Sequence, residues 1–213
     1  LAFESSTNSN SNNGTIIFDL NESATGTPTL GCKNGAPANL WTFPRPSAAA
    51  WHHYCLTFNF TAAQSVLNAY VDGVAQTLTA YPGNSTLTGN FQDYVWYFMS
   101  RGNASLWGAG RQAEFAIWPG ITLDAAEAVS LSKGLSPLLI RPTTRPYYWP
   151  IMGRTSPEIE LCNGSGLTVN SATQTDHMGV IYPKRRQLMS ESPPFFPRYA
   201  RNANPPPVVG AAT

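Results

Sequence analysis

The sequence predicts an all-β protein, an antiparallel β-sandwich with one short helix and extended terminal arms. Three observations lead to this fold class. Short runs of strand-forming residues, separated by Gly, Pro and Asn, recur between Thr15 and Trp118. The dipeptide Asp72-Gly73 is the strongest short signal for a β-hairpin. Only the segment 123–134 has the composition and terminal signals of a helix.

The predicted strands are bounded by turn residues such as Pro82-Gly83-Asn84 and Gly89-Asn90. The three strands between Trp51 and Tyr81, the first two joined by the polar residues 61–65, follow one another closely, which predicts an antiparallel meander inside a larger sheet. In chain order, the predicted strands are Thr15–Leu20, Leu40–Phe43, Trp51–Phe60, Val66–Asp72, Val74–Tyr81, Tyr94–Ser100 and Gln112–Trp118.

The strand Trp51–Phe60 has two faces of different character, because successive side chains of a strand point to opposite sides. One face is the better candidate for the core. It carries His52, Tyr54, Leu56, Phe58 and Phe60, whereas Trp51, His53, Cys55, Thr57 and Asn59 occupy the other face.

The strand that contains Tyr94 to Met99 is apolar on both faces. Tyr94, Trp96 and Phe98 point to one side, and Val95, Tyr97 and Met99 to the other. A strand of an open sandwich normally shows one face to water. We therefore expect the second face to be covered by a loop, the carboxyl-terminal arm, a neighbouring subunit or a ligand. Cover from within the chain is the first of these alternatives, a partner chain the second and a bound glycan the last.

The predicted helix, 123–134, is placed at the edge of the sandwich, with Asp124 in its first turn and Lys133-Gly134 as its stop. Prolines then recur between Ser136 and Pro157, which predicts an extended segment that buries Tyr147-Tyr148-Trp149 against a surface. The last short strands are predicted at Glu158–Leu161, Leu167–Val169 and Val180–Tyr182.

These elements divide the chain into four segments. Residues 1–14 are predicted to form a flexible N-terminal arm, and residues 15–135 the sandwich. Residues 136–183 form a proline-rich extended segment with short strands that packs on the sandwich. Residues 184–213 form a proline-rich C-terminal arm, whose aromatic residues predict docking on a partner.

The low charge of the chain bears on its partners. Charged residues make up 12% of the sequence and the net charge is +1, so no long-range field attracts nucleic acid or an anionic membrane. We interpret the cluster Lys184-Arg185-Arg186 as part of a surface tail. No apolar run reaches the roughly 18 residues that a membrane span requires. Any leader is expected to be missing or removed, because the first residue is Leu and no basic segment precedes an apolar run.

The three cysteines, Cys32, Cys55 and Cys162, are too few for a disulfide scaffold. Cys55 lies between apolar residues and is predicted to be a buried free thiol. A disulfide between two of the three cysteines is the alternative that the sequence leaves open. Because no two cysteines are closely spaced, a zinc site is not expected. We predict no metal and no cofactor.

Three motifs carry a family resemblance over residues 14–135. Trp51-His52-His53 opens a strand, Ala69-Tyr70-Val71-Asp72-Gly73-Val74 closes the hairpin, and Gly110 to Trp118 precedes the helix. Their order resembles the concanavalin A-like jelly roll of the laminin G and pentraxin type. The following motifs, from Gly134-Leu135-Ser136-Pro137 to Ile181-Tyr182-Pro183, resemble a region that follows this jelly roll in proteins of tailed bacteriophages. The resemblance implies a virion component such as a head decoration, a fibre or another surface attachment.

The resemblance also raises two chemistries, and the sequence supports neither. Glycosidases of this superfamily use a Glu-X-Asp-X-X-Glu strand, whereas Glu158-Ile159-Glu160 lacks the middle Asp and the third carboxylate. Glu114 stands alone in its strand. Calcium would need clustered oxygen ligands. Asp72 is explained by its turn, and Asp19, Asp93 and Asp124 are scattered.

Histidines and aromatic residues are the remaining candidates for a site. His52 and His53 point to opposite faces, so they do not share a metal, and a structural role near the hairpin is predicted for at least one. No nucleophile-elbow motif accompanies them or His177. We interpret most of the aromatic residues as core or interface residues. The conceivable platforms for sugar rings are Trp96, Tyr97, Trp107 and Trp149.

The leading functional hypothesis is a non-enzymatic structural virion protein of a bacteriophage. We expect a capsid decoration or another protein of the virion surface, attached through its extended arms to other virion proteins and to copies of itself, with glycan adhesion as an added capacity. The alternative is a secreted or cell-surface lectin-like module that binds carbohydrate. No catalytic, metal-binding or ligand-binding residue is assigned.

Overall fold

The computed structural model describes residues 1–21, 26–35, 38–47, 50–60 and 66–181, and every structural statement below refers to these ranges. The described residues form one compact unit. The polar connection 61–65, Tyr182 of the last predicted strand and the C-terminal arm with Lys184-Arg185-Arg186 lie outside the described residues.

The larger of the sheets has six strands, all paired antiparallel, in the order β8-β4-β3-β2-β1-β9. It carries β1 in its interior, between β2 and β9. The strands are β1 (Phe3–Ser5), β2 (Thr15–Asp19), β3 (Thr29–Lys33), β4 (Asn39–Thr42), β8 (Thr79–Ala80) and β9 (Trp96–Phe98).

A second sheet contains β5 (Tyr54–Phe58), β6 (Val66–Val71) and β7 (Val74–Ala75) as an antiparallel meander, as predicted. The turn between β6 and β7 has positive φ at both Asp72 (52°) and Gly73 (80°), the conformation that Asp-Gly favours in a two-residue hairpin. A third, two-stranded sheet pairs β10 (Phe115–Ile117) with β11 (Tyr147–Trp149). The all-β, antiparallel fold class with one short helix is confirmed.

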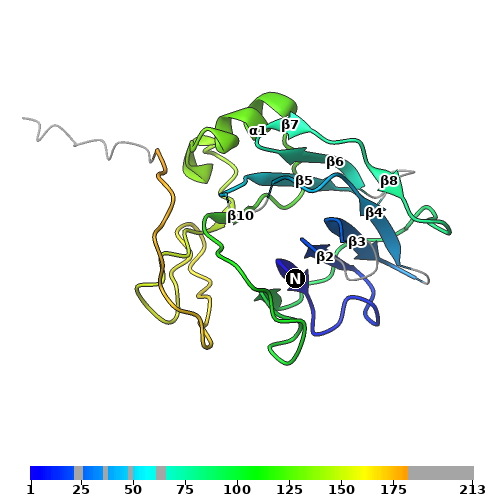
Figure 1. Cartoon of the computed structure of the whole chain (residues 1–213), viewed down its shortest axis with the longest axis horizontal. Coiled ribbons are helices and arrows are strands. Elements are labelled where there is room, and N and C mark those ends of the chain that lie inside the picture. Colours follow the sequence, from blue (N-terminus) through cyan, green and yellow to red (C-terminus); the bar gives the residue numbers. More distant parts are fainter. Residues whose placement is uncertain (22–25, 36–37, 48–49, 61–65, 182–213) are drawn as a thin grey trace, which may run out of the picture. The chain divides into compact units, whose positions relative to one another are not determined.

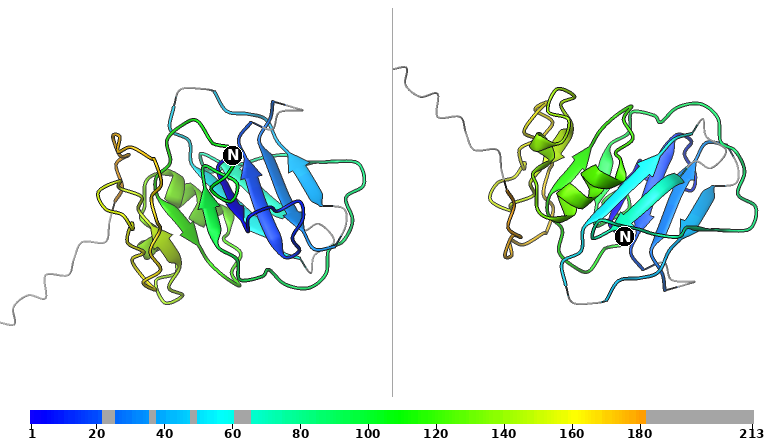
Figure 2. Two further views of the ribbon diagram at one scale, coloured as in Figure 1. Left: turned by 90° about the horizontal axis from the view of Figure 1, so that it is seen from below. Right: turned by 90° about the horizontal axis from the view of Figure 1, so that it is seen from above.

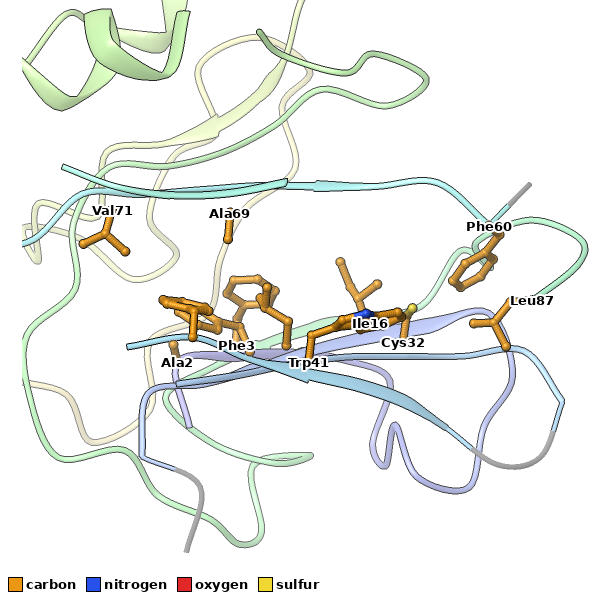
Figure 3. Packing of buried hydrophobic residues seen from close by; sticks show 12 residues of the cluster. Ala2, Phe3, Ile16, Cys32, Trp41, Phe60, Ala69, Val71 and Leu87 are labelled. Carbon is orange, nitrogen blue, oxygen red and sulfur yellow. The ribbon is translucent and has the colours of Figure 1, made fainter. Parts of the chain in front are cut away.

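The six-stranded and three-stranded sheets face each other across a hydrophobic core (Figure 1). Figure 3 shows side chains such as Trp41 from one sheet and Ala69 and Val71 from the other pointing into this layer. The core face predicted for the strand Trp51–Phe60 is correct for four of its members. Tyr54, Leu56, Phe58 and Phe60 all pack in the core cluster.

The helix α1 (Ala125–Ser132) covers the outer face of the three-stranded sheet. It begins with a capping box, in which Asp124 Oδ1 accepts from the Glu127 amide and the Glu127 carboxylate accepts from the Asp124 amide. Cys55 and Tyr70 pack against its apolar face. The expectation of a helix at the sandwich edge is therefore wrong, because Cys55 and Tyr70 give the outer face apolar groups to bury.

The flexible arm predicted for residues 1–14 is also wrong. Phe3 is 8% exposed and pairs with Phe18 on one side and Phe98 on the other. The following loop is tied back, since the Ser6 amide donates to the Val95 carbonyl. Although the segment is rich in Ser and Asn, its one large aromatic residue and its backbone bonds give it a place in the sheet.

Two further strand predictions need correction. The predicted strand Val74–Tyr81 is split between β7 and β8, which belong to different sheets, so the chain crosses between layers here. The strand β3 was not predicted because Gly31 interrupts its apolar pattern. The glycine is needed there: a Cβ at Gly31 would lie 2.6 Å from Ile17 Cγ2 and 2.7 Å from Leu40 Cδ2.

The proline-rich segment after the helix buries its aromatic residues, as predicted. Figure 2 shows it at one end of the compact unit, beside α1 and β10. Tyr148 is fully buried and Trp149 is 7% exposed. The short strands predicted beyond it are reduced to isolated bridges, one between Glu158 and Leu167 and one between Leu135 and Ile181.

Candidate functional site

A cleft of about 2020 Å³ is lined by residues of both the six-stranded and the three-stranded sheet. The core strands β1, β2 and β9 contribute to one wall, and β5 and β10 contribute to the other. The connection from β4 to β5 closes part of its rim through the described residues 45–47 and 50–53. We call the described residues 45–47 and 50–53 of this connection the crossover segment.

The cleft collects much of the exposed apolar surface of the described chain. Trp107 is 61% exposed and Val95 is 68% exposed, which is unusual for side chains of this size. A hydrophobic rim of this kind is typical of a surface that binds another molecule. The large, exposed apolar side chains that line the cleft are Trp51, Phe91, Val95, Leu106, Trp107 and Tyr147.

The second face of β9 is covered only in part. Tyr97 pairs with Glu4, and directly opposed residues share a face of the sheet. Glu4 is fully buried, and its carboxylate accepts from the Ser9 amide and, at 2.9 Å, from Arg101 Nε. The expected intramolecular cover is therefore present over Glu4, while Val95 stays exposed.

The four aromatic residues considered as stacking platforms for sugar rings lie in different environments. Trp96 and Trp149 both contact Phe115, with ring centroids 5.8 and 6.2 Å away, inside the aromatic core. Tyr97 is half-buried. Trp107 alone among the four is well exposed, and it lines the cleft.

His52, which lines the cleft, forms a well-defined polar cluster with Asp72. His52 Nδ1 lies 2.7 Å from Asp72 Oδ2, and His52 Nε2 lies 2.8 Å from the Ser47 carbonyl oxygen. The other carboxylate oxygen, Asp72 Oδ1, accepts from the His53 amide at 2.9 Å. The predicted structural role of a histidine at the hairpin is confirmed, since His52 joins the β6–β7 turn to the crossover segment.

The pKa values of this cluster follow from these contacts. The hydrogen bond to Asp72 raises the pKa of His52 above its ordinary value of 6.5, against a smaller opposing effect of burial. Burial acts to raise the pKa of Asp72, but the hydrogen bonds from His52 and the His53 amide outweigh it and lower the pKa. Burial lowers the pKa of His53, which favours its neutral ring.

A second polar cluster joins β10, β11 and the segment after Gly166. Glu114 accepts a hydrogen bond from the Tyr148 hydroxyl, and Glu114 Oε1 lies 3.0 Å from His177 Nε2. The same nitrogen lies 3.0 Å from the Pro150 carbonyl oxygen. Sequence reasoning placed Glu114 alone and gave His177 no partner, because the residues are far apart in the chain.

Glu158 and Glu160 do not face the cleft, and both are buried. Glu158 accepts from the Arg154 amide. Glu160 accepts from four backbone amides, those of Tyr148, Cys162, Asn163 and Gly164. These carboxylates hold turns of the backbone in place.

The described part of the chain contains no metal-binding cluster and no membrane-spanning helix. No group of three His, Cys, Asp or Glu side chains there is placed to hold a metal ion. No helix in the described ranges is long and apolar enough to cross a membrane. Cys55 is a buried free thiol, as predicted, and burial raises its pKa to about 11, which keeps it protonated.

Sequence reasoning missed the Ser47 carbonyl as the second partner of His52 and missed the pairing of Glu4 with Arg101. Pro44 and Pro46 favour an extended backbone next to Ser47, which is the one signal in the sequence that could have indicated this connection. Comparison of the chain with protein-family models, with curated proteins and with solved structures found no match in any of the three.

Proposed function

We propose that this chain is a non-enzymatic structural protein of a bacteriophage virion, built on a concanavalin A-like jelly-roll sandwich. Its role is capsid decoration or another attachment at the particle surface. Its partners are other virion proteins and further copies of the chain, and the C-terminal arm contributes to attachment. The proposal rests on one contrast. The candidate catalytic carboxylates already accept hydrogen bonds from the protein itself, whereas the apolar side chains at the cleft rim are exposed to solvent.

The occupied groups argue for binding rather than catalysis. A general acid or a nucleophile needs an oxygen directed at a substrate position. Glu160 directs its oxygens to backbone amides, and Asp72 directs its oxygens to His52 and the His53 amide. The cleft rim instead offers Val95, Leu106 and Trp107, groups suited to contact with another surface.

The distribution of charge supports attachment through the C-terminal segment. Residues 184–213 contain five basic residues and one acidic residue, a net charge of +4, which leaves residues 1–183 at −3. The near-neutral total thus hides two oppositely charged parts. A basic segment with aromatic residues is suited to an acidic neighbour in a particle.

Detection of the chain in purified virus particles is the direct test of the proposal. Antibodies raised against the folded chain should label virions from the source of the sequence in immunogold electron microscopy, and mass spectrometry of purified particles should detect the chain. In parallel, the purified full-length protein should leave polysaccharides intact. Absence from particles, or turnover of a polysaccharide, would contradict the proposal.

Carbohydrate binding is a second candidate function, and one specific observation favours it. Trp107 presents an exposed indole at a cleft whose rim is mainly uncharged, and sugar rings stack on such faces. Under this alternative the chain is a lectin-like module, at a virion or a cell surface.

A glycan array separates this candidate from assembly alone. Saturable binding by the full-length protein should be lost in Trp107→Ala and kept in Ile159→Ala, which removes an apolar side chain of similar exposure that does not line the cleft. Glycan binding that is retained in Trp107→Ala, or the absence of binding to any glycan, would contradict the hypothesis of a lectin-like module that binds through Trp107.

A further inference from the structure

We propose that the cleft binds a small, uncharged alcohol whose hydroxyl group forms hydrogen bonds with His53 and Trp118. Both side chains line the cleft. Their nitrogens, His53 Nδ1 and Trp118 Nε1, are buried and have no hydrogen-bond partner among the described residues. Binding at this site requires neither attachment to a virion nor the exposed indole of Trp107.

Buried polar atoms without a partner gather at the cleft. In the described ranges there are four such side-chain atoms, Ser9 Oγ, His53 Nδ1, Gln112 Oε1 and Trp118 Nε1. All of them except Ser9 Oγ belong to residues that line the cleft. Buried polar groups of native proteins nearly always have a hydrogen-bond partner. Their concentration at one cleft therefore indicates a molecule that supplies the missing partners.

His53 and Trp118 have a common neighbour in Cys55. Side chains alternate along a strand, so His53, which immediately precedes β5, shares a face of this strand with Cys55. Trp118 packs against the hydrophobic cluster that contains Cys55 and residues of α1. The two unpartnered nitrogens therefore belong to one region of the cleft wall.

This region of the wall is apolar around the two nitrogens. Its side chains come from the cluster beneath α1, and they also line the cleft. A small-molecule site typically combines such a surface, which takes the carbon skeleton of the ligand, with a few polar groups that fix its orientation. The apolar side chains are Cys55, Ile121, Leu123 and Leu131.

The hydrogen-bonding capacities of the two nitrogens select a hydroxyl group. The indole N–H of Trp118 is a donor only. Burial lowers the pKa of His53, so its ring is neutral, and Nδ1 donates or accepts according to the tautomer. A hydroxyl group both donates and accepts. It therefore accepts from Trp118 and pairs with His53 in either tautomer.

The same groups favour an uncharged ligand. A buried ion needs a partner of opposite charge, and neither the indole of Trp118 nor the neutral ring of His53 supplies one. Two charged side chains elsewhere in the cleft wall already have partners. Glu114 lies 3.0 Å from His177 Nε2, and Arg101 Nε donates to Glu4 at 2.9 Å.

An NMR titration of the full chain with benzyl alcohol tests the site. This probe should shift the indole N–H signal of Trp118, which is assigned by its loss in Trp118→Phe, and the amide signals of β5. Toluene lacks the hydroxyl group and benzoate is charged, so each should bind about five-fold more weakly or worse. No shift with benzyl alcohol would mean that water alone serves these nitrogens. That result, or equal binding of toluene or benzoate, would overturn the proposal.

Side-chain variants locate the hydroxyl contact. Trp118→Phe and His53→Leu should each weaken the binding of benzyl alcohol about five- to ten-fold, followed on the amide signals of β5, because one hydrogen bond is lost. His53→Asn keeps an amide atom near the position of Nδ1 and should retain most of the affinity. Wild-type affinity in Trp118→Phe would overturn the proposal, and this variant decides if thermal unfolding shows that His53→Leu does not fold.

Trp107→Ala is the control that separates this site from the glycan candidate. Trp107 lines the cleft but does not belong to the cluster beneath α1. The variant should therefore bind benzyl alcohol as the wild type does, even where it loses a glycan. Loss of benzyl alcohol binding in Trp107→Ala would place the alcohol at the exposed indole and overturn the assignment to His53 and Trp118.

Discussion

Glu160 is a buried carboxylate that is held by several donors. Four backbone amides converge on a side chain whose residue is 3% exposed. Burial by itself raises the pKa of a carboxyl group, but these hydrogen bonds outweigh it and lower the pKa of Glu160. The residue therefore organises the turn 160–164 as a charged acceptor.

Replacing Glu160 by Gln should destabilise the protein by about 2 kcal/mol at neutral pH, because an amide leaves some of the buried amides without an acceptor. A lowered pKa contributes stability above the ordinary value of 4.5 and loses it as the pH falls through the folded value. The difference in unfolding free energy between wild type and variant, measured by urea denaturation, should therefore become smaller at acidic pH.

Glu158→Gln is the matched control, since Glu158 is equally buried but holds the single amide of Arg154. It should destabilise the protein less than Glu160→Gln in urea unfolding at neutral pH. If both variants behave alike, the four-amide contact is not the source of the effect.

At the scale of elements, the β6–β7 turn and the helix α1 fit closely against each other. A Cβ at Gly73 would lie 2.7 Å from Ser132 Oγ and 3.0 Å from Val129 Cα. Because the second of these is a backbone atom of the helix, it does not move aside easily. The Asp-Gly turn thus serves the hairpin and also the approach of the helix to the sheet.

Gly73→Ala should destabilise the protein by about 2 to 3 kcal/mol, from strain at its positive φ and from the clash with α1. Gly120→Ala separates the two causes. Gly120 also has a positive φ, of 71°, but a Cβ there meets nothing within 4 Å. Its cost should be about 1 kcal/mol in thermal unfolding. Equal destabilisation by Gly73→Ala and Gly120→Ala would show that α1 shifts to accommodate the added Cβ at position 73.

At the scale of the whole compact unit, Phe115 joins the two-stranded sheet to the six-stranded sheet through its ring. Its centroid lies 5.3 Å from that of Phe3, 4.5 Å from that of Phe98 and 6.2 Å from that of Trp149. These partners belong to β1, β9 and β11. The proline-rich segment after the helix is therefore packed on the same core as the main sheets.

Phe115→Ala should lower the stability of the protein by about 3 kcal/mol and keep a single unfolding transition. Calorimetry of the full chain measures both quantities. Tyr147→Ala, which removes an exposed ring stacked on Trp149, should cost much less. Two separate transitions in the wild type, one of them unaffected by Phe115→Ala, would contradict a shared core.

The candidate site was only partly accessible to sequence reasoning. Adjacent strand positions correctly separated His52 from His53, because side-chain alternation is a local property. The partner Ser47 acts through its backbone carbonyl, which no side-chain pattern reveals. The contact of Glu114 with His177 spans more than sixty positions and depends on how two distant segments meet.

The sequence by itself determined the elements whose signals are local. The alternation of Tyr54 to Phe60, the hairpin at Asp72-Gly73 and the capped helix each follow from the periodicity or the turn and capping chemistry of a few neighbouring residues. The tertiary structure decided the rest: the place of β1 inside the sheet, the split of β7 from β8, and the contact of His52 with Asp72. These depend on contacts between residues far apart in the chain, whose free energy exists only once the layers have come together.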